Sequence, residues 1–147
     1  MSWAGRTCRI YNVEQPGYYV TPENSDDKQS PLACSRNSES SLGRFLISPV
    51  EGSTGFHIIS VGDRPDWRVV IDPEDLEDVD YPSMEPGEFG AEPFEWAIES
   101  VGPDIWRINM PGMDQCWSLP GRDYLRIQMR IPNDGDDEFW RIEIVDD

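Results

Sequence analysis

The chain has 147 residues, with 29 acidic and 12 basic side chains and a formal net charge of −17 at pH 7. This charge argues against a phosphate-binding surface, which needs clustered Lys and Arg, and against docking on anionic membranes. We therefore expect no nucleic acid and no membrane as a partner. Six Trp, five Tyr and five Phe supply enough bulky apolar surface for a single domain that spans residues 1–147.

Short strand patterns separated by Pro and Gly run along the chain, without a sustained helical period. In chain order, a first group of predicted strands comprises Arg9–Val13, Tyr18–Thr21, Leu32–Ser35 and Arg44–Ser48. A second group comprises His57–Val61, Trp67–Ile71, a weaker segment near Val79–Met84, and Glu95–Val101. A third group comprises Trp106–Met110, Cys116–Leu119, Tyr124–Ile131 and Phe139–Val145. The pattern predicts an all-β protein.

An internal repeat of about fifty residues decides between all-β architectures. The first strands align through Ile10, Ile58 and Ile108. The second strands align through Tyr18-Tyr19-Val20, Trp67-Arg68-Val69 and Trp117-Ser118-Leu119, and the last through Phe45-Leu46-Ile47, Trp96-Ala97-Ile98 and Trp140-Arg141-Ile142. Three four-stranded units are too few for a propeller, which needs about four to eight blades. We predict a β-trefoil, a six-stranded barrel with a hairpin cap, from three pseudo-symmetric repeats at about 5–50, 55–101 and 104–147.

Large apolar side chains at repeated positions belong in the core of such a fold, and we expect Trp96, Trp117 and Trp140 there. The three cysteines, Cys8, Cys34 and Cys116, are an odd number without a close pair, so buried reduced thiols are expected. The opening residues lack the apolar region of a secretory signal, and no segment reaches the apolar length of a membrane span. A cytoplasmic location is the simplest expectation.

Catalytic motifs are scarce. A Ser-His-Asp or Cys-His site would rest on His57 alone, and no phosphate loop or dinucleotide fingerprint is present. The acidic segment Asp72–Met84 lacks the glycine and terminal glutamate of a calcium-binding EF-hand loop, so it reads as a solvated surface loop. We predict a non-enzymatic protein with neither a cofactor nor a metal.

Lys28 is the only lysine, and it lies in a polar segment between Pro22 and Pro31 that joins two predicted strands. A long cation on such a loop could enter the acidic specificity pocket of a trypsin-like protease, because bracketing prolines reduce the ordering cost of binding. Asp26 and Asp27 compete for the ammonium group. A solvated lysine that offsets these two carboxylates is therefore the alternative.

The two ends of the chain resemble the small cytosolic β-trefoil proteins of mushrooms. The opening Ala-Gly-Arg-Thr-Cys-Arg-Ile-Tyr-Asn-Val resembles their Gly-x-Tyr-x-Ile-x-Asn-Val start, and Phe-Trp-Arg-Ile-Glu-Ile resembles their Trp-x-Ile end. In the cospin and cnispin type of serine protease inhibitor, a basic residue between strands two and three enters the protease pocket. Lys28 falls at that place. On the inhibitor hypothesis, Asp27, Gln29 and Ser30 add backbone and rim contacts, and Asn24 and Pro31 shape the loop ends. Arg64, between the fifth and sixth predicted strands, is a second candidate cation.

Two other members of that group suggest different functions. Mycocypins inhibit papain-like cysteine proteases through hairpin loops, and Gly17, in the turn Glu14-Gln15-Pro16-Gly17, is loosely similar to their Gly-Gly turn. Ricin-type lectins carry Gln-x-Trp in each repeat, but the aligned triplets here are Gly43-Arg44-Phe45, Phe94-Glu95-Trp96 and Glu138-Phe139-Trp140. For a sugar platform the least core-like aromatics are Trp3, Trp106 and Tyr124. The leading prediction is a trypsin-like protease inhibitor; a carbohydrate-binding lectin and a papain-like protease inhibitor are the alternatives.

Overall fold

The computed structural model describes residues 3–14, 17–22, 32–35, 43–52, 55–61, 64–70, 83–86, 95–110, 115–119, 127–132 and 135–145. Within these ranges the chain forms one 12-stranded sheet and a short 3-10 helix. In chain order the elements are β1 (Thr7–Asn12), β2 (Tyr19–Pro22), β3 (Leu32–Ser35), β4 (Phe45–Pro49), β5 (Phe56–Val61), β6 (Arg64–Val70), β7 (Ser83–Pro86), β8 (Trp96–Gly102), β9 (Ile105–Asn109), β10 (Cys116–Ser118), β11 (Gln128–Arg130), η2 (Asp136–Glu138) and β12 (Trp140–Ile144).

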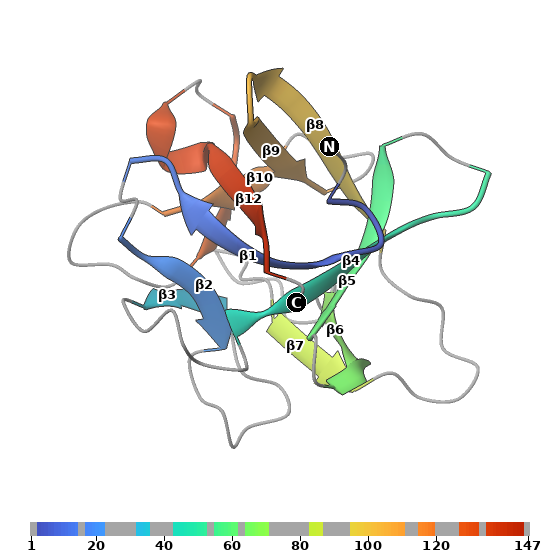
Figure 1. Cartoon of the computed structure of the whole chain (residues 1–147). Helices are drawn as coiled ribbons and strands as arrows, with labels where there is room; N and C mark the ends of the chain where they lie inside the picture. The colour runs from blue at the N-terminus through green and yellow to red at the C-terminus, as the bar shows by residue number, and fades with distance from the viewer. Residues whose placement is uncertain are drawn as a thin grey trace.

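Six of these strands close into a barrel (Figure 1). Around the ring, β1 pairs with β4, β4 with β5, β5 with β8, β8 with β9, β9 with β12, and β12 with β1. The other strands form the hairpins β2–β3, β6–β7 and β10–β11, each joined to the first strand of its own repeat. Closure leaves the barrel without exposed edges. The β-trefoil prediction is confirmed.

The described strands agree with the expected ones, with differences at their ends. The sixth strand begins at Arg64 rather than Trp67, and the seventh is Ser83–Pro86 rather than a segment near Val79–Met84. The eleventh is Gln128–Arg130, shorter than the expected Tyr124–Ile131. Most of the acidic segment 72–84 and Tyr124 lie outside the described residues. No helix in the described ranges has the length and apolar character that a membrane span requires.

Backbone pairing identifies the equivalent positions of the three repeats. The first strand pairs with the second at Tyr11–Tyr19, Ser60–Arg68 and Asn109–Cys116. Tyr11, Ser60 and Asn109 are therefore equivalent, and the residue before each is an isoleucine: Ile10, Ile59 and Ile108. All three isoleucines are fully buried. The expected alignment through Ile58 is therefore wrong by one residue. Because side chains alternate between the faces of a strand, this shift places Ile58 on the outside of the barrel, where it is half-buried.

A second correction concerns the third repeat. In the hairpins, Val20 pairs with Cys34, Val69 with Met84, and Trp117 with Met129. The position equivalent to Val20 and Val69 is therefore Trp117, and not Leu119. Leu119 lies two residues further along, just beyond the end of β10.

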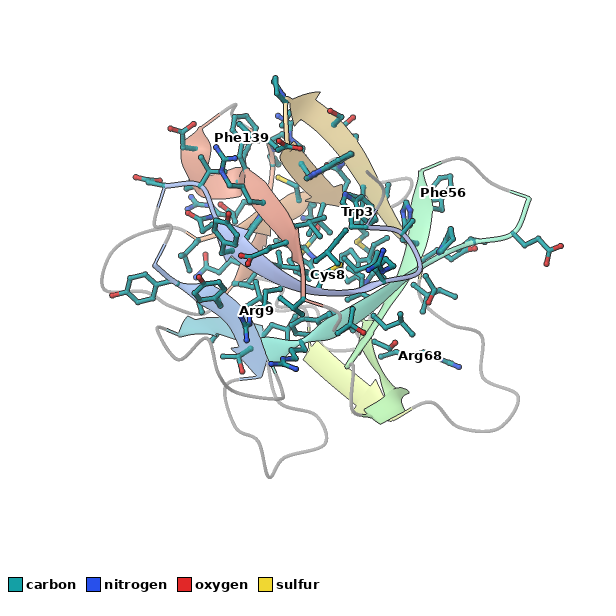
Figure 2. All side chains as sticks on the ribbon, viewed as in Figure 1. Trp3, Cys8, Arg9, Phe56, Arg68 and Phe139 are labelled. Atoms are coloured by element: carbon teal, nitrogen blue, oxygen red, sulfur yellow. The ribbon has the colours of Figure 1, made fainter. Side chains whose placement is uncertain are left out.

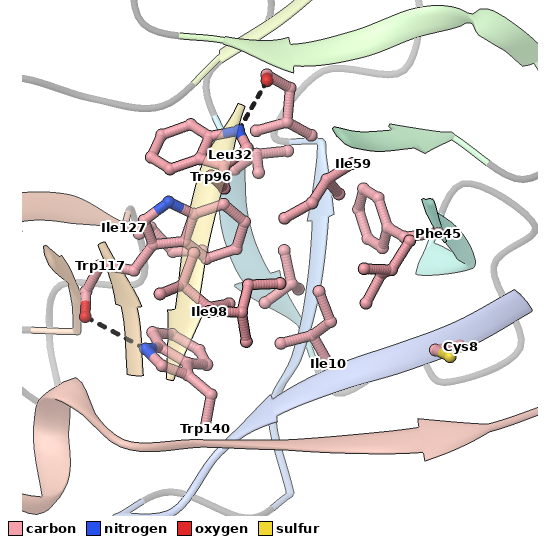
Figure 3. Close-up of a cluster of buried hydrophobic side chains, with 14 of the residues drawn as sticks. Cys8, Ile10, Leu32, Phe45, Ile59, Trp96, Ile98, Trp117, Ile127 and Trp140 are labelled. Carbon is pink, nitrogen blue, oxygen red and sulfur yellow. Dashed lines mark hydrogen bonds between the residues drawn. The ribbon is translucent and has the colours of Figure 1, made fainter. Parts of the chain in front are cut away.

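Three indoles fill the core where the hairpins meet the barrel (Figure 3). Trp96, Trp117 and Trp140 are each fully buried, as predicted. The ring of Trp117 meets the other two edge-on, with centroid distances of 5.3 Å to Trp96 and 6.1 Å to Trp140. Trp96 Nε1 donates to the Val69 carbonyl at 2.8 Å, and Trp140 Nε1 donates to the Trp117 carbonyl at 3.1 Å. Two of the three indoles thus tie a barrel strand to a hairpin.

The three thiols are free and buried, as expected. Burial raises the pKa of Cys34 to about 12. The pKa of Cys116 is raised to about 12 by burial first and by the nearby Glu138 carboxylate second. Because the thiolate is the reactive form, these two thiols are chemically inert near neutral pH.

Candidate functional site

The predicted protease-binding loop lies outside the described residues, but its anchors are described. The residues concerned are Asn24, Asp27, Lys28, Gln29, Ser30 and Pro31. On either side of them, β2 ends at Pro22 and β3 begins at Leu32, and these two residues pair directly. Val20 and Leu32 are fully buried, so the hairpin base that carries the segment is fixed in the core.

Arg64 and Gly17, the secondary candidates for a protease contact, lie in different structural environments. Arg64 was expected between the fifth and sixth strands, but it is the first residue of β6 and pairs with Val61. Its backbone is thus part of the sheet rather than of a free loop, because residues 62–63 alone separate the two strands. Gly17 is exposed, and a Cβ at this position would meet no atom within 4 Å. A side chain at Gly17 therefore has room, which suits a test by substitution.

Trp3, one of the proposed sugar-stacking aromatics, belongs to the core instead. It is 8% exposed and closes one end of the barrel against the rings of His57 at 4.9 Å and Trp106 at 5.1 Å. The Cys8 thiol also faces its carbonyl at 3.7 Å. Gly5 makes the turn that delivers Trp3, with a φ of +78° that disfavours any side chain. Trp106 is partly buried against the same cluster.

His57, on which a catalytic site would have to rest, lies inside this packed barrel end. The side chain is 8% exposed, and its Nδ1 lies 3.3 Å from the Gly55 carbonyl. Burial lowers the pKa of His57, and the backbone hydrogen bond only partly opposes this, so the neutral ring is favoured. The described residues contain no group of three or more His, Cys, Asp or Glu side chains placed to hold a metal ion.

An arginine on the third repeat is held by two carboxylates, and we call this group the closed arginine cluster: Glu99, Arg107, Glu138 and Phe139. Arg107 Nη1 donates to Glu99 at 3.0 Å, and Nη2 donates to Glu138 at 3.1 Å. The guanidinium also lies 5.5 Å from the Phe139 ring centroid. Glu138 is 1% exposed, and its other oxygen accepts from the Cys116 thiol at 3.7 Å. This guanidinium is therefore already neutralised.

A second polar group lies on the outside of the first repeat, across β12, β1 and β2. We call it the tyrosine face: Arg9, Tyr11, Tyr19, Arg141 and Glu143. Residues of β1 alternate between half-buried and buried, which turns Arg9 and Tyr11 outward while Cys8 and Ile10 enter the core. Arg9 is opposite Glu143, and Tyr11 is opposite both Arg141 and Tyr19. Figure 2 shows Arg9 between β1 and β2, well apart from Phe139 beside η2.

The tyrosine face combines aromatic rings with charged groups at short range. The rings of Tyr11 and Tyr19 lie 5.5 Å apart at an interplanar angle of 55°. The Arg9 guanidinium lies 5.9 Å from the Tyr19 centroid. Partial burial raises the pKa of Tyr11, with a further rise from Glu143 and an opposing effect of Arg141. Both tyrosines are half-buried and Glu143 is exposed, so the rings form a fixed platform with charges around it.

The two polar groups occupy equivalent places in the trefoil. Arg9 and Arg107 each precede the buried isoleucine of the first strand, and each is opposite a glutamate of the preceding barrel strand, Glu143 or Glu99. The inner carboxylate differs, because the place of Glu138 is taken by Gly43 in the first repeat. In the second repeat the opposed residues are Ser48 and Ile58. The first repeat thus keeps the arginine but lacks its buried partner.

Sequence reasoning missed the tyrosine face because it followed inward positions only. The signal was present in the sequence: Arg9 and Arg107 stand immediately before equivalent isoleucines, Ile10 and Ile108. Arg141 and Glu143 alternate in the last strand with the inward Trp140 and Ile142. Once the first and last strands of a trefoil are taken as neighbours, these outward residues must share one face.

Comparisons with known proteins relate this chain to others by fold. No family model and no curated protein sequence matches it. A ricin B-like lectin of Macrolepiota procera, in complex with lactose, superposes with a TM-score of 0.78 at 14% identity, covering 99% of each chain. A designed threefold-symmetric protein, ThreeFoil, gives a TM-score of 0.78 at 10% identity, covering 95% of this chain and 99% of that one.

A third solved structure is the Polyporus squamosus lectin bound to a human-type influenza-binding epitope, Neu5Aca2-6Galb1-4GlcNAc. Its TM-score is 0.79 at 11% identity, and the match covers 98% of this chain and 50% of the lectin. Together with the closed six-stranded barrel and its three hairpins, these superpositions show that the chain has the β-trefoil fold, which it shares with ricin B-like lectins.

Proposed function

We propose that this protein is a carbohydrate-binding β-trefoil lectin. The observation that carries the proposal is the tyrosine face, where two half-buried rings lie 5.5 Å apart with the charged groups of Arg9, Arg141, Glu143 and Asp104 near them. A pyranose ring stacks its C–H groups on the negative face of an aromatic ring, while its hydroxyl groups pair with charged donors and acceptors. The lactose-bound Macrolepiota procera lectin, which matches over the whole chain, supports the same function.

The location differs from that expected for a Gln-x-Trp site. In the third repeat the position of that glutamine is held by Glu138, which is buried and engaged with Arg107 and Cys116. In the first repeat it is Gly43, which carries no side chain. Among the described residues, the tyrosine face on the outer strands is the place where aromatic rings and charged groups combine at short range.

Replacing Tyr19 with serine is expected to lower the affinity for a bound glycan about tenfold, because the stacking surface is lost. A glycan array identifies the ligand, and isothermal titration calorimetry then compares the variants. The matched control is Phe56→Ser, which removes another half-buried aromatic ring, from β5, away from the face. The absence of saturable binding to any neutral or acidic sugar would contradict the lectin proposal.

Inhibition of a trypsin-like serine protease through Lys28 is a second candidate function. The observation that favours it is the direct pairing of Pro22 with Leu32, which holds the two ends of the segment that contains Lys28 side by side. A loop whose ends are fixed has less conformational entropy to lose on binding. A typical protease–inhibitor interface buries on the order of 1,600 Å², so a second loop would have to contribute.

Titration of trypsin with the wild-type protein and with Lys28→Ala tests this second function. If Lys28 occupies the specificity pocket, the wild type inhibits stoichiometrically and the variant loses the inhibition, because the pocket carboxylate has no cation to pair with. Arg130→Ala, at an exposed arginine of β11, is the charge-matched control. Inhibition that survives Lys28→Ala would move the contact to Arg64 or another loop.

If trypsin is not inhibited, the next function to test is inhibition of a papain-like cysteine protease. Substitution of Gly17 tests it without disturbing the fold. Because a side chain has room there, Gly17→Trp is expected to fold normally and to block only the approach of a protease to the first hairpin. Papain inhibition that is absent from the wild type, or unaffected by Gly17→Trp, rules out the first hairpin as the contact.

A further inference from the structure

Among the described residues, the arginines of the tyrosine face form no ion pair with a carboxylate. Arg107 forms two ion pairs, whereas within the described part of the chain neither Arg9 nor Arg141 forms one. The Nε of Arg9 is buried and, like the Nε of Arg107, has no hydrogen-bond partner among the described residues, so the two arginines differ at their terminal nitrogens. Arg9 is instead held by its packing against the Tyr19 ring, 5.9 Å from the centroid. A guanidinium fixed in this way keeps its terminal donors free for an acceptor from outside the chain.

The closed arginine cluster shows what the same position looks like when it is satisfied. Arg107 faces two carboxylates at 3.0 and 3.1 Å, so one positive charge meets two negative charges. On the tyrosine face, Arg9 and Arg141 lie among two carboxylates, Glu143 and Asp104, that act on Tyr11, but neither arginine forms an ion pair with them. The position of the buried Glu138 is held there by Gly43, which has no side chain. The first repeat thus keeps an arginine, Arg9, that has no ion-pair partner among the described residues, within a chain of net charge −17. An anionic group of a ligand would pair with the donors of Arg9 directly.

We infer that the tyrosine face binds an acidic sugar, with the sugar carboxylate paired to the guanidinium of Arg9 and the pyranose ring stacked on Tyr19 and Tyr11. This inference rests on the proposed lectin function and adds the chemical class of the ligand. Guanidinium groups match planar carboxylates because two parallel N–H donors meet two oxygens. Arg141, diagonal to Arg9 across β12 and β1, supplies a second donor on the other side of Tyr11.

The acidic surface elsewhere on the protein does not prevent this recognition. Electrostatic repulsion between exposed charges is screened beyond about 8 Å at physiological ionic strength. A carboxylate in contact with Arg9 and Arg141 is therefore affected mainly by these two charges and by the nearby Glu143 and Asp104. A neutral sugar would stack on the same rings but would leave both guanidinium groups unpaired, and this difference gives the site its selectivity.

The test is a titration with matched sugars. We would follow backbone amide shifts of the ¹⁵N-labelled protein as it binds methyl β-glucuronide, N-acetylneuraminic acid and, as the neutral match, methyl β-glucoside. At least one of the two acids is expected to bind about tenfold or more tightly than the glucoside, with shifts at Tyr11, Tyr19 and Arg141, because hydrogen bonds between charged groups are the strong ones. The two acids distinguish a uronic acid from a sialic acid as the ligand.

Variants of Arg9 assign the selectivity to the site. Arg9→Gln is expected to bring the ratio of the affinities for acidic and neutral sugars close to one. Arg9→Lys is expected to keep part of this preference, because the positive charge remains but the two parallel N–H donors of the guanidinium are lost. Arg130→Gln removes the same charge from exposed β11 and is expected to leave the ratio unchanged. If Arg9→Gln proves unfolded by circular dichroism, Arg141→Gln, from the same face, carries the test.

The outcomes separate this inference from the lectin proposal. Equal binding of neutral and acidic sugars, or an acid preference that survives Arg9→Gln, overturns the inference and leaves lectin function intact. If Arg9→Gln and Arg130→Gln lower the preference for acidic sugars equally, the preference is a general effect of charge, and the inference is also overturned. The absence of binding to all sugars overturns both.

Discussion

Replacing Glu138 with glutamine is expected to lower the free energy of unfolding by about 3 kcal/mol, the low end of the range for breaking a buried ion pair. Glu138 is 1% exposed and accepts from Arg107 at 3.1 Å, so the amide leaves a largely buried guanidinium short of one carboxylate. Glu99, which binds the same guanidinium, keeps the loss from being larger. Urea denaturation followed by circular dichroism measures the change.

Glu99 offers a matched control, because it pairs with the same guanidinium at a similar distance but with a side chain that is 54% exposed. Glu99→Gln makes the same chemical change, and we expect a loss of no more than about 1 kcal/mol, as for surface ion pairs. Equal losses in the two variants would contradict the view that burial makes Glu138 important. Replacing both Arg107 and Glu138 with methionine should recover much of the loss, because no buried charge is left unpaired. Glu99 loses its arginine in this variant, but its side chain is 54% exposed and stays hydrated.

The sequence was sufficient for the fold because a β-trefoil repeats its inward side chains. Phe45, Trp96 and Trp140 were aligned correctly, and all three are fully buried at equivalent places. Large aromatic residues at this spacing admit few alternatives, since each repeat must supply one bulky side chain to a shared core. The hairpins followed from the same spacing, because a second strand shortly after each first strand requires a tight turn.

The errors arose where neighbouring residues were chemically alike. Ile58 and Ile59 are identical, and nothing in the local sequence distinguishes which one turns inward. The structure decides by pairing: Ile59 is opposite Ile47, an inward residue of β4, whereas Ile58 is opposite Ser48. Side-chain direction alternates along a strand, so the inward residues are set by the register with the partner strand. A comparison of the three repeat sequences does not contain that register.

The candidate site was harder to predict than the fold. The tyrosine face joins residues from the two ends of the chain, Arg9 and Tyr11 from β1 with Arg141 and Glu143 from β12. The contrast between Arg9 and Arg107 is visible only in the closed barrel, where the equivalent Arg107 forms two ion pairs. The loop with Lys28 stands out in the sequence by composition alone. Its role stays a prediction, and the trypsin titration decides it.

The three buried indoles allow the contribution of their hydrogen bonds to be measured separately from their volume. Trp96→Phe and Trp140→Phe each remove ring atoms and a hydrogen bond, to the Val69 and Trp117 carbonyls respectively. We expect each to lower the free energy of unfolding by about 3 kcal/mol, from the cavity and the acceptor that is left unpaired. Trp117 differs, because its buried Nε1 has no hydrogen-bond partner within the described part of the chain (Figure 3).

Trp117→Phe is therefore expected to cost only about 1–2 kcal/mol, although its ring is as deeply buried as the others. The substitution creates a similar cavity, but it also removes a donor whose desolvation is uncompensated, and the two effects oppose each other. Chemical denaturation followed by circular dichroism avoids the fluorescence changes that the substitutions themselves cause. If Trp117→Phe lowers the free energy of unfolding as much as Trp96→Phe and Trp140→Phe, a buried water accepts a hydrogen bond from Trp117 Nε1. All three indole nitrogens would then be hydrogen-bonded.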